Sequence, residues 1–156
     1  MSNIDFMKNA INVASENVLS NHGGPFGAIV VKDGKIIGIG RNEVTATNDP
    51  TAHAEMQAIR AACHYINSFQ LLDCDIYTSC EPCPMCIGAI YWARPRAVYY
   101  ACTKDEAAKI GFDDQFIYEQ LSLPIEQRKL KMQQIIPDQS DLPFRTWENS
   151  RGKVNY

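Results

Sequence analysis

Apolar side chains near the start of the chain recur at the spacing of a helix. Phe6, Ala10 and Val18 fall on one side of a helical period. Ser2 lies three residues before Asp5, and such a pair is typical of a capped helix start. The pattern therefore predicts a first helix with an apolar face.

Two β-rich runs follow a Gly-Gly-Pro break at 23–25. They span 26–31 and 36–40, and the Lys-Asp-Gly-Lys sequence at 32–35 between them suits a tight turn. The sequence therefore predicts a β-hairpin.

Helices and strands then alternate. The segment 52–64 has the pattern of a helix with Thr51 as its N-cap, and the segment 85–93 has that of a helix ending before a proline. Short β-rich runs lie at 74–78 and 97–101.

The order of these elements predicts an α/β fold. A hairpin followed by alternating helices and strands favours a mixed central sheet covered by helices, with its later strands parallel. Further helical pieces are expected from Lys104 onward. The helices at 52–64 and 85–93 both begin after loops at one end of the sheet, where open α/β sheets usually bind ligands.

Length and composition indicate how many domains these elements form. With 46% apolar residues, the 156 residues fit one globular domain spanning 1–156. The segment 131–156 is expected to be a C-terminal tail, in which Phe144 and Trp147 have the spacing to dock on a neighbour.

The charge balance narrows the partners. A net charge of −3 supplies no broad attraction for nucleic acid or anionic lipid, so a small or neutral substrate is expected. Charged and polar residues interrupt the apolar residues of the first 19 positions, so this segment lacks the apolar core of a signal peptide. No later stretch is long enough to span a bilayer. We therefore expect a cytoplasmic protein with no membrane partner.

Three cysteines stand at every third position in TSCEPCPMC, residues 78–86. Cys83 and Cys86 begin a helix, so both thiolates point the same way and gain from the helix dipole, as zinc ligands would. Cys80 lies outside this helix and is predicted to be a structural thiol. The ferredoxin spacing fails because Ile90 stands where a fourth cysteine is required, although spacing alone leaves open a cluster that uses Cys102 or Cys74.

The third protein ligand is predicted to be His53. A lone histidine at a helix start is more often a cap or a surface residue, but His53-Ala54-Glu55 followed by Pro82-Cys83-x-x-Cys86 matches the H-x-E…P-C-x-x-C pattern of zinc deaminases. Three ligands leave the fourth tetrahedral position for water, as in a catalytic zinc site.

Glu55 is predicted to be the catalytic proton shuttle. Zinc makes hydroxide available at neutral pH, and Glu55 would take the water's proton, pass it to a ring nitrogen and help to expel ammonia. The alternative role of Glu55 is that of a solvated glutamate at a helix start, where the helix dipole favours a negative charge. Residues i and i+2 do not share a helix face, so His53 and Glu55 are expected to converge at the helix end.

Four segments together resemble the cytidine deaminase superfamily and, within it, the bacterial guanine deaminases. They are GGPFGAIVVKDG at 23–34, NDPTAHAE at 48–55, TSCEPCPMCIGAIYWARP at 78–95 and GFDDQFIY at 111–118. The resemblance implies a three-layer cytidine-deaminase-like fold and one Zn²⁺ per subunit with a bound water. It also implies deamination of guanine to xanthine in purine metabolism, and a homodimer with a tail that covers the active site or swaps between subunits.

The resemblance also implies a set of substrate-binding residues. Phe26 would stack on the purine, Asn42 would hydrogen-bond it, the Ala54 backbone would contact it, Trp92 would wall the site, Asp114 would bind its polar edge, and Tyr156 would close over it. Without the resemblance these residues also fit core packing (Phe26 and Trp92), a turn (Asn42), a helix cap (Asp113 with Asp114) and a frayed terminus (Tyr156).

Three other functions remain open on the sequence alone. A tRNA adenosine deaminase shares the two motifs but needs a basic surface, and a deaminase of free cytosine or another nucleobase shares the same chemistry. A non-catalytic zinc-stabilised binding module is the third, and Glu55 with an open fourth position argues against it.

Overall fold

The computed structural model describes residues 1–156 and contains a four-stranded mixed sheet in the order β2-β1-β3-β4. β1 (Gly27–Lys32) pairs antiparallel with β2 (Lys35–Arg41) and with β3 (Cys74–Cys80), and β4 (Ala97–Cys102) pairs parallel with β3. The predicted hairpin and the predicted parallel pairing of the later strands are both confirmed.

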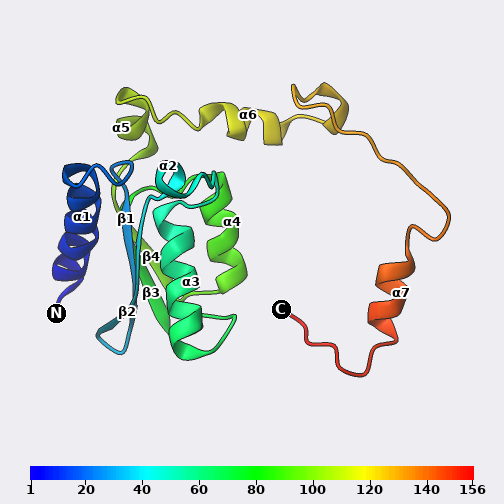
Figure 1. Cartoon of the computed structure of the whole chain (residues 1–156), viewed down its shortest axis with the longest axis horizontal. Coiled ribbons are helices and arrows are strands. Elements are labelled where there is room, and N and C mark those ends of the chain that lie inside the picture. The colour runs from blue at the N-terminus through cyan, green and yellow to red at the C-terminus, as the bar shows by residue number, and fades with distance from the viewer. The chain divides into compact units, whose positions relative to one another are not determined.

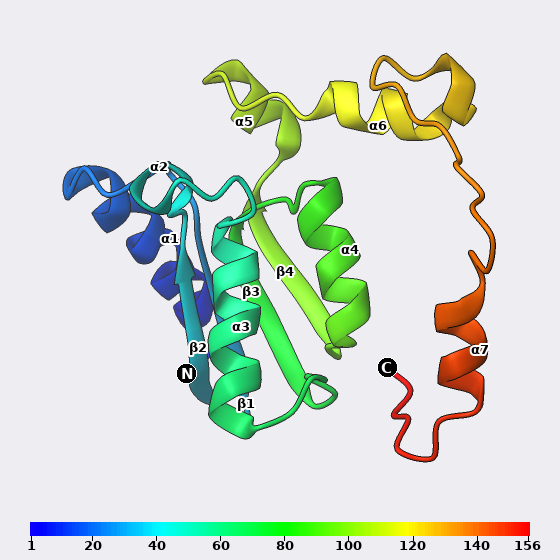
Figure 2. The same ribbon diagram turned by 45° about the vertical axis from the view of Figure 1, so that its right-hand side comes forward.

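Helices cover both faces of the sheet. α1 (Asn3–Leu19) lies on one face, and α3 (Ala54–Ile66) and α4 (Pro84–Ala93) lie on the other (Figures 1 and 2). Alternate residues of β1 point to opposite faces, so Ile29 belongs to the core under α1 and Val30 to the core under the other two helices. These are the three layers that the resemblance predicted.

Two glycines allow α3 to approach β2 closely. A Cβ atom on Gly40 would lie 2.0 Å from the carbonyl oxygen of Ala54, and one on Gly38 would lie 2.6 Å from that of Ala58. Both distances are far inside van der Waals contact, so the start of α3 can rest on β2 only because these strand positions lack side chains.

The cap of α1 is as predicted, but that of α3 is not. Ser2 and Asp5 form a reciprocal capping box at the start of α1. The prediction that Thr51 caps the second helix is wrong, because α3 begins at Ala54 with His53 as its N-cap residue. The hydroxyl of Thr51 instead lies 2.7 Å from Oδ1 of Asp49, within the preceding turn.

The chain divides into two compact units, Met1–Gln115 and Phe116–Tyr156. The first also contains α2 (Val44–Thr47) and α5 (Lys104–Lys109). α6 (Gln115–Ser122) begins at the boundary, and the 3₁₀ helix Ile125–Gln127 and α7 (Leu142–Glu148) follow it. None of the helices combines the length and the apolar character that crossing a bilayer requires.

Candidate metal centre

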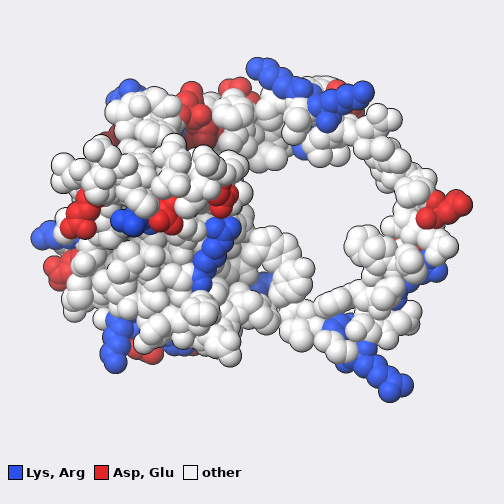
Figure 3. Space-filling model, in the orientation of Figure 1, with Lys and Arg blue, Asp and Glu red and all other residues white.

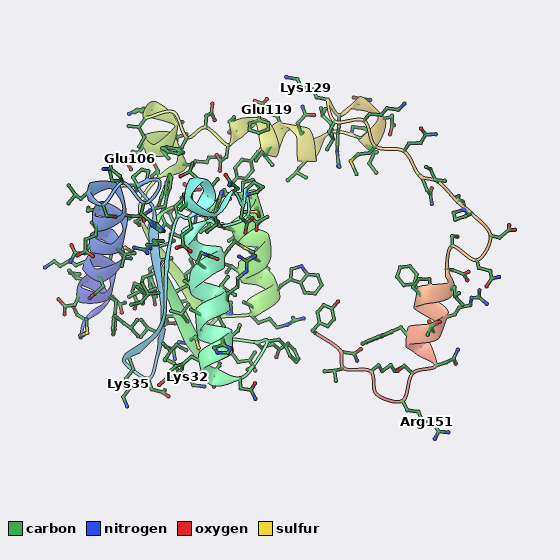
Figure 4. The ribbon with its side chains drawn as sticks, in the orientation of Figure 1. Lys32, Lys35, Glu106, Glu119, Lys129 and Arg151 are labelled. Carbon is green, nitrogen blue, oxygen red and sulfur yellow. The ribbon has the colours of Figure 1, made fainter.

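The starts of α3 and α4 lie at the end of the sheet opposite the β1–β2 turn (Figure 1). The side-chain view marks the turn end by Lys32 and Lys35 and the opposite end by Glu106 (Figure 4). His53 is the N-cap residue of α3 and Cys83 that of α4, and both have an extended backbone. Pro84 then fixes the first turn of α4, and Cys86 lies in that turn.

His53, Cys83 and Cys86 converge into one cluster. Nδ1 of His53 lies 3.5 Å from the Sγ atoms of both Cys83 and Cys86. All three ligand atoms lie within 4.8 Å of one another. Zinc bonds of about 2.05 Å to nitrogen and about 2.3 Å to sulfur in a tetrahedron require N···S separations of about 3.5 Å. Both N···S separations therefore match those around a zinc ion.

The protonation of the two thiols also suits a cation. The pKa of Cys83 is lowered to about 4, chiefly because the Cys86 thiol donates a hydrogen bond to it and also because His53 interacts with it. The same hydrogen bond, with burial, raises the pKa of Cys86 above its usual range. The pair thus holds one proton between two sulfurs, and a divalent cation would replace that proton.

Glu55 lies beside the cluster rather than in it. It is 7% exposed, and its Oε2 atom lies 3.4 Å from Sγ of Cys86. Burial raises the pKa of its carboxyl, because the charged form is poorly solvated there. The helix start thus brings His53 and Glu55 together despite their i, i+2 spacing, and leaves a carboxyl that can accept and return a proton.

Thr78 is a contact of Glu55 that the sequence reasoning missed. It is 1% exposed on β3, and its Oγ1 lies 3.4 Å from Oε1 of Glu55 and 3.1 Å from the carbonyl oxygen of Cys80. Its place in the TSCEPC segment could have pointed to it. Nothing in the spacing, however, indicates that β3 runs behind the glutamate.

Cys80 stands apart from the metal cluster. Its Sγ lies 3.7 Å from the carbonyl oxygen of Thr103, and burial raises its pKa to about 11. A thiol with this pKa is protonated at neutral pH and is a poor nucleophile. All six cysteines of the chain are free.

Two predicted substrate-binding residues lie side by side next to α3. The backbone nitrogen of Asn42 donates to the carbonyl oxygen of Phe26 at 3.2 Å, and that of Glu43 donates to Ala52 at 2.9 Å. Asn42 is 8% exposed, and Ala54 is fully buried at the helix start. The ring of Phe26 meets that of Phe112 edge-to-face, with centroids 4.9 Å apart, a contact that the sequence reasoning also missed.

The other three predicted residues have different surroundings. Burial and, second to it, the negative charge of Cys83 raise the pKa of Asp114, which places its carboxyl within electrostatic reach of the cluster. Asp113 instead accepts a hydrogen bond from the backbone nitrogen of Gln115, the first residue of α6, at 2.9 Å. Trp92 is 63% exposed on α4, and Tyr156, which is 71% exposed, ends the second unit.

Comparisons with known proteins agree with this geometry. The family model of the cytidine and deoxycytidylate deaminase zinc-binding region matches residues 1–102. The chain is 52% identical over 156 residues to a guanine deaminase of Bacillus subtilis (strain 168), and the match covers 100% of both chains. The X-ray structure of guanine deaminase from Bacillus subtilis superposes with a TM-score of 0.98, covering 100% of this chain and 99% of that one.

More distant relatives match less of the chain. A structure of guanine deaminase from Nitrosomonas europaea is 31% identical, with a TM-score of 0.69 over 72% of this chain and 65% of that one. A tRNA-specific adenosine deaminase of Aquifex aeolicus is 46% identical over 77 residues, which are 49% of this chain and 51% of that protein. Similarity to the tRNA enzyme thus stops well short of the whole chain.

Proposed function

The chain belongs to the zinc-dependent cytidine and deoxycytidylate deaminase family, and from that membership we propose that it hydrolyses guanine to xanthine and ammonia. The observation that carries the proposal is the cluster of His53, Cys83 and Cys86 with Glu55 against it, on a chain similar along its whole length to a guanine deaminase. The six free cysteines suit a reducing compartment, so we place the reaction in the cytoplasm.

The residues divide the chemistry between them. His53, Cys83 and Cys86 would hold one zinc ion, which when bound supplies a Lewis acid that activates water at neutral pH. Glu55 accepts a proton from the attacking water at its carboxylate and gives it to the ring nitrogen beside the carbon under attack. It then gives a proton to the amine, which leaves as ammonia. One guanine and one water thus yield one xanthine and one ammonia.

The base-binding residues face different parts of guanine. Oδ1 of Asn42 accepts from the backbone nitrogens of Gly24 and Val44 at 3.4 and 3.3 Å, so its Nδ2 remains to donate to the base. Phe26 would stack on the ring and the Ala54 backbone would contact it, with Trp92 as a wall. Asp114 would accept from N1–H, whereas adenine presents an acceptor at N1 and would be rejected.

Replacing Asp114 tests this account of selectivity. We expect Asp114→Asn to lower kcat/KM for guanine by roughly 10- to 100-fold, because an acceptor paired with a substrate donor is weakened in the pocket. The matched control is Asp113→Asn, which makes the same change at the neighbouring carboxyl that bonds the start of α6, and it should change kcat/KM less than about 3-fold. Equal losses in the two variants would contradict the role given to Asp114.

We propose further that the enzyme is a homodimer in which the C-terminal tail of one subunit covers the other. On the first unit, an apolar groove is lined by residues that include Ile11, Val18 and Ile110. In the second unit, Phe144 and Trp147 are exposed apolar residues without a hydrophobic core of their own. A second copy supplies the partner for both surfaces, and domain exchange is a low-cost route to such dimers.

Shortening the tail tests whether Tyr156 closes the site. We expect deletion of residues 154–156 to lower kcat/KM for guanine by roughly 10-fold or more, because the shortened chain lacks the residue that closes over the bound base. Thermal melting and zinc content should stay as in the full chain, because these residues are exposed. Unchanged kinetics in the shortened enzyme would remove Tyr156 from the site.

A panel of substrates tests the proposed function itself. Purified protein should release ammonia from guanine and not from adenine, cytosine or a tRNA anticodon stem. On the face shown in Figure 3, basic and acidic side chains of the first unit are interspersed rather than gathered into one basic surface for RNA. Salt-sensitive release from the tRNA stem would favour the adenosine deaminase, and zinc without any ammonia would favour a binding module.

A further inference from the structure

A buried side chain on α1 joins the two loops that carry Phe26 and Asn42. Asn17 is 1% exposed and lies near the end of α1. Its Nδ2 atom donates to the carbonyl oxygen of Gly24 at 2.8 Å and to that of Asn42 at 2.9 Å. One amide group thus ties the segment before Phe26 to the residue that follows β2.

The loops have little freedom to shift without each other. The backbone of Asn42 donates to Phe26, and its side chain accepts from the backbone of Gly24, as described above. A Cβ atom on Gly23 would lie only 2.2 Å from the carbonyl oxygen of Asn42, so the two chain segments are in direct contact. A displacement of the Asn42 carbonyl therefore moves both its own side chain and the segment that carries Phe26.

The amide at position 17 has a cost to stability as well as a gain. Oδ1 of Asn17 is buried and has no hydrogen-bond partner. A buried acceptor without a partner costs stability, and an apolar side chain would avoid that cost only by taking away the donor used by the carbonyl oxygens of Gly24 and Asn42. The distinctive contribution of Asn17 is its pair of donors, and both are used on the substrate-binding loops.

We propose that Asn17 is a positioning residue that sets the geometry of base recognition through Asn42 and the 24–26 segment. The inference rests on the proposed function, because it assigns these loops to guanine. Asn17 makes its hydrogen bonds to Gly24 and Asn42, and not to Glu55 or to the metal cluster. Its loss therefore weakens binding of the base and leaves the proton-transfer step nearly unchanged.

Asn17→Leu tests the role, since leucine has the same branching at Cγ and no donor. We expect KM for guanine to rise roughly 10-fold and kcat to change less than about 3-fold, the signature of lost base binding. The dissociation constant of the product xanthine, measured by calorimetry, should rise by a similar factor. Zinc content should not change. The control is Asn9→Leu, which removes the hydrogen bond that the Asn9 side-chain amide donates to the Asp5 carbonyl oxygen within the same helix, and it should leave KM unchanged.

A double-mutant cycle separates positioning from a general loss of structure. In an Asn42→Ala background, Asn17→Leu should raise KM by a clearly smaller factor than in the wild type, because the Asn42 side chain that it positions is gone and only its effect on the 24–26 segment remains. Equal increases in the two backgrounds, or a folded Asn17→Leu with normal KM and normal xanthine affinity, would overturn the proposal.

Two further outcomes are kept distinct. If Asn17→Leu does not fold, Asn17→Ala replaces it in the same measurements, with the same expected direction for KM and xanthine affinity and the same overturning result. A wild-type protein that releases no ammonia from guanine refutes the proposed function. If the wild type deaminates guanine and the variant at position 17 has the same KM and the same xanthine affinity, only the role of Asn17 is refuted.

Discussion

Glu55→Gln is expected to retain one zinc per subunit and to lose roughly 100- to 10,000-fold in kcat for guanine, the usual contribution of a positioned proton-transfer group. Glutamine preserves the size of the side chain and its contacts with Thr78 and Cys86. It can neither accept a proton from water nor return one to the ring nitrogen. The measurement is ammonia release at saturating guanine, with metal content determined on the same preparation.

The matched control for this loss is Glu16→Gln, which makes the same chemical change on an exposed position of α1. It should leave kcat unchanged within about 2-fold, as surface substitutions usually do. A Glu55→Gln enzyme with full zinc and near-normal kcat would remove Glu55 from the mechanism. Loss of zinc together with activity would show that its carboxylate supports the metal site rather than the proton transfer.

The parts of the fold that were predicted from the sequence have local causes. The hairpin follows from a turn in which Asp33 and Gly34 take positive φ angles, and the capping box follows from the spacing of Ser2 and Asp5. The H-x-E and P-C-x-x-C motifs predicted the metal cluster for a similar reason. Each places its side chains within a single helix start, so the short spacing itself encodes their convergence.

The side-chain contacts that could not be predicted from the sequence join distant segments of the chain. Thr78 reaches Glu55 from β3, Phe112 reaches Phe26, and Asn17 reaches two backbone oxygens of other loops. Such contacts leave no period and no fixed spacing, because they depend on the path of the chain between the partners. The wrong prediction of Thr51 as the cap of α3 has a local cause, because the hydroxyl of Thr51 bonds Asp49 instead.

Removal of a metal ligand should have the other large effect. We expect His53→Ala and Cys83→Ala to lose stoichiometric zinc and to lower guanine turnover more than roughly 1,000-fold, because Lewis-acid activation contributes several kcal/mol to such a reaction. Zinc at a thousand times its dissociation constant stabilises a folded protein by about 4 kcal/mol. Both variants should therefore also melt at a lower temperature than the zinc-loaded wild type.

Two exposed residues of the same types serve as controls. His64→Ala alters the last turn of α3, and Cys102→Ala alters the end of β4, so each repeats the chemical change away from the cluster. Metal analysis, melting and ammonia release should match the wild type in both. Full zinc content in Cys83→Ala would place the metal elsewhere. Full activity in a zinc-free preparation would mean that the nucleophile is generated without the metal, and the reaction would then need another source of activated water.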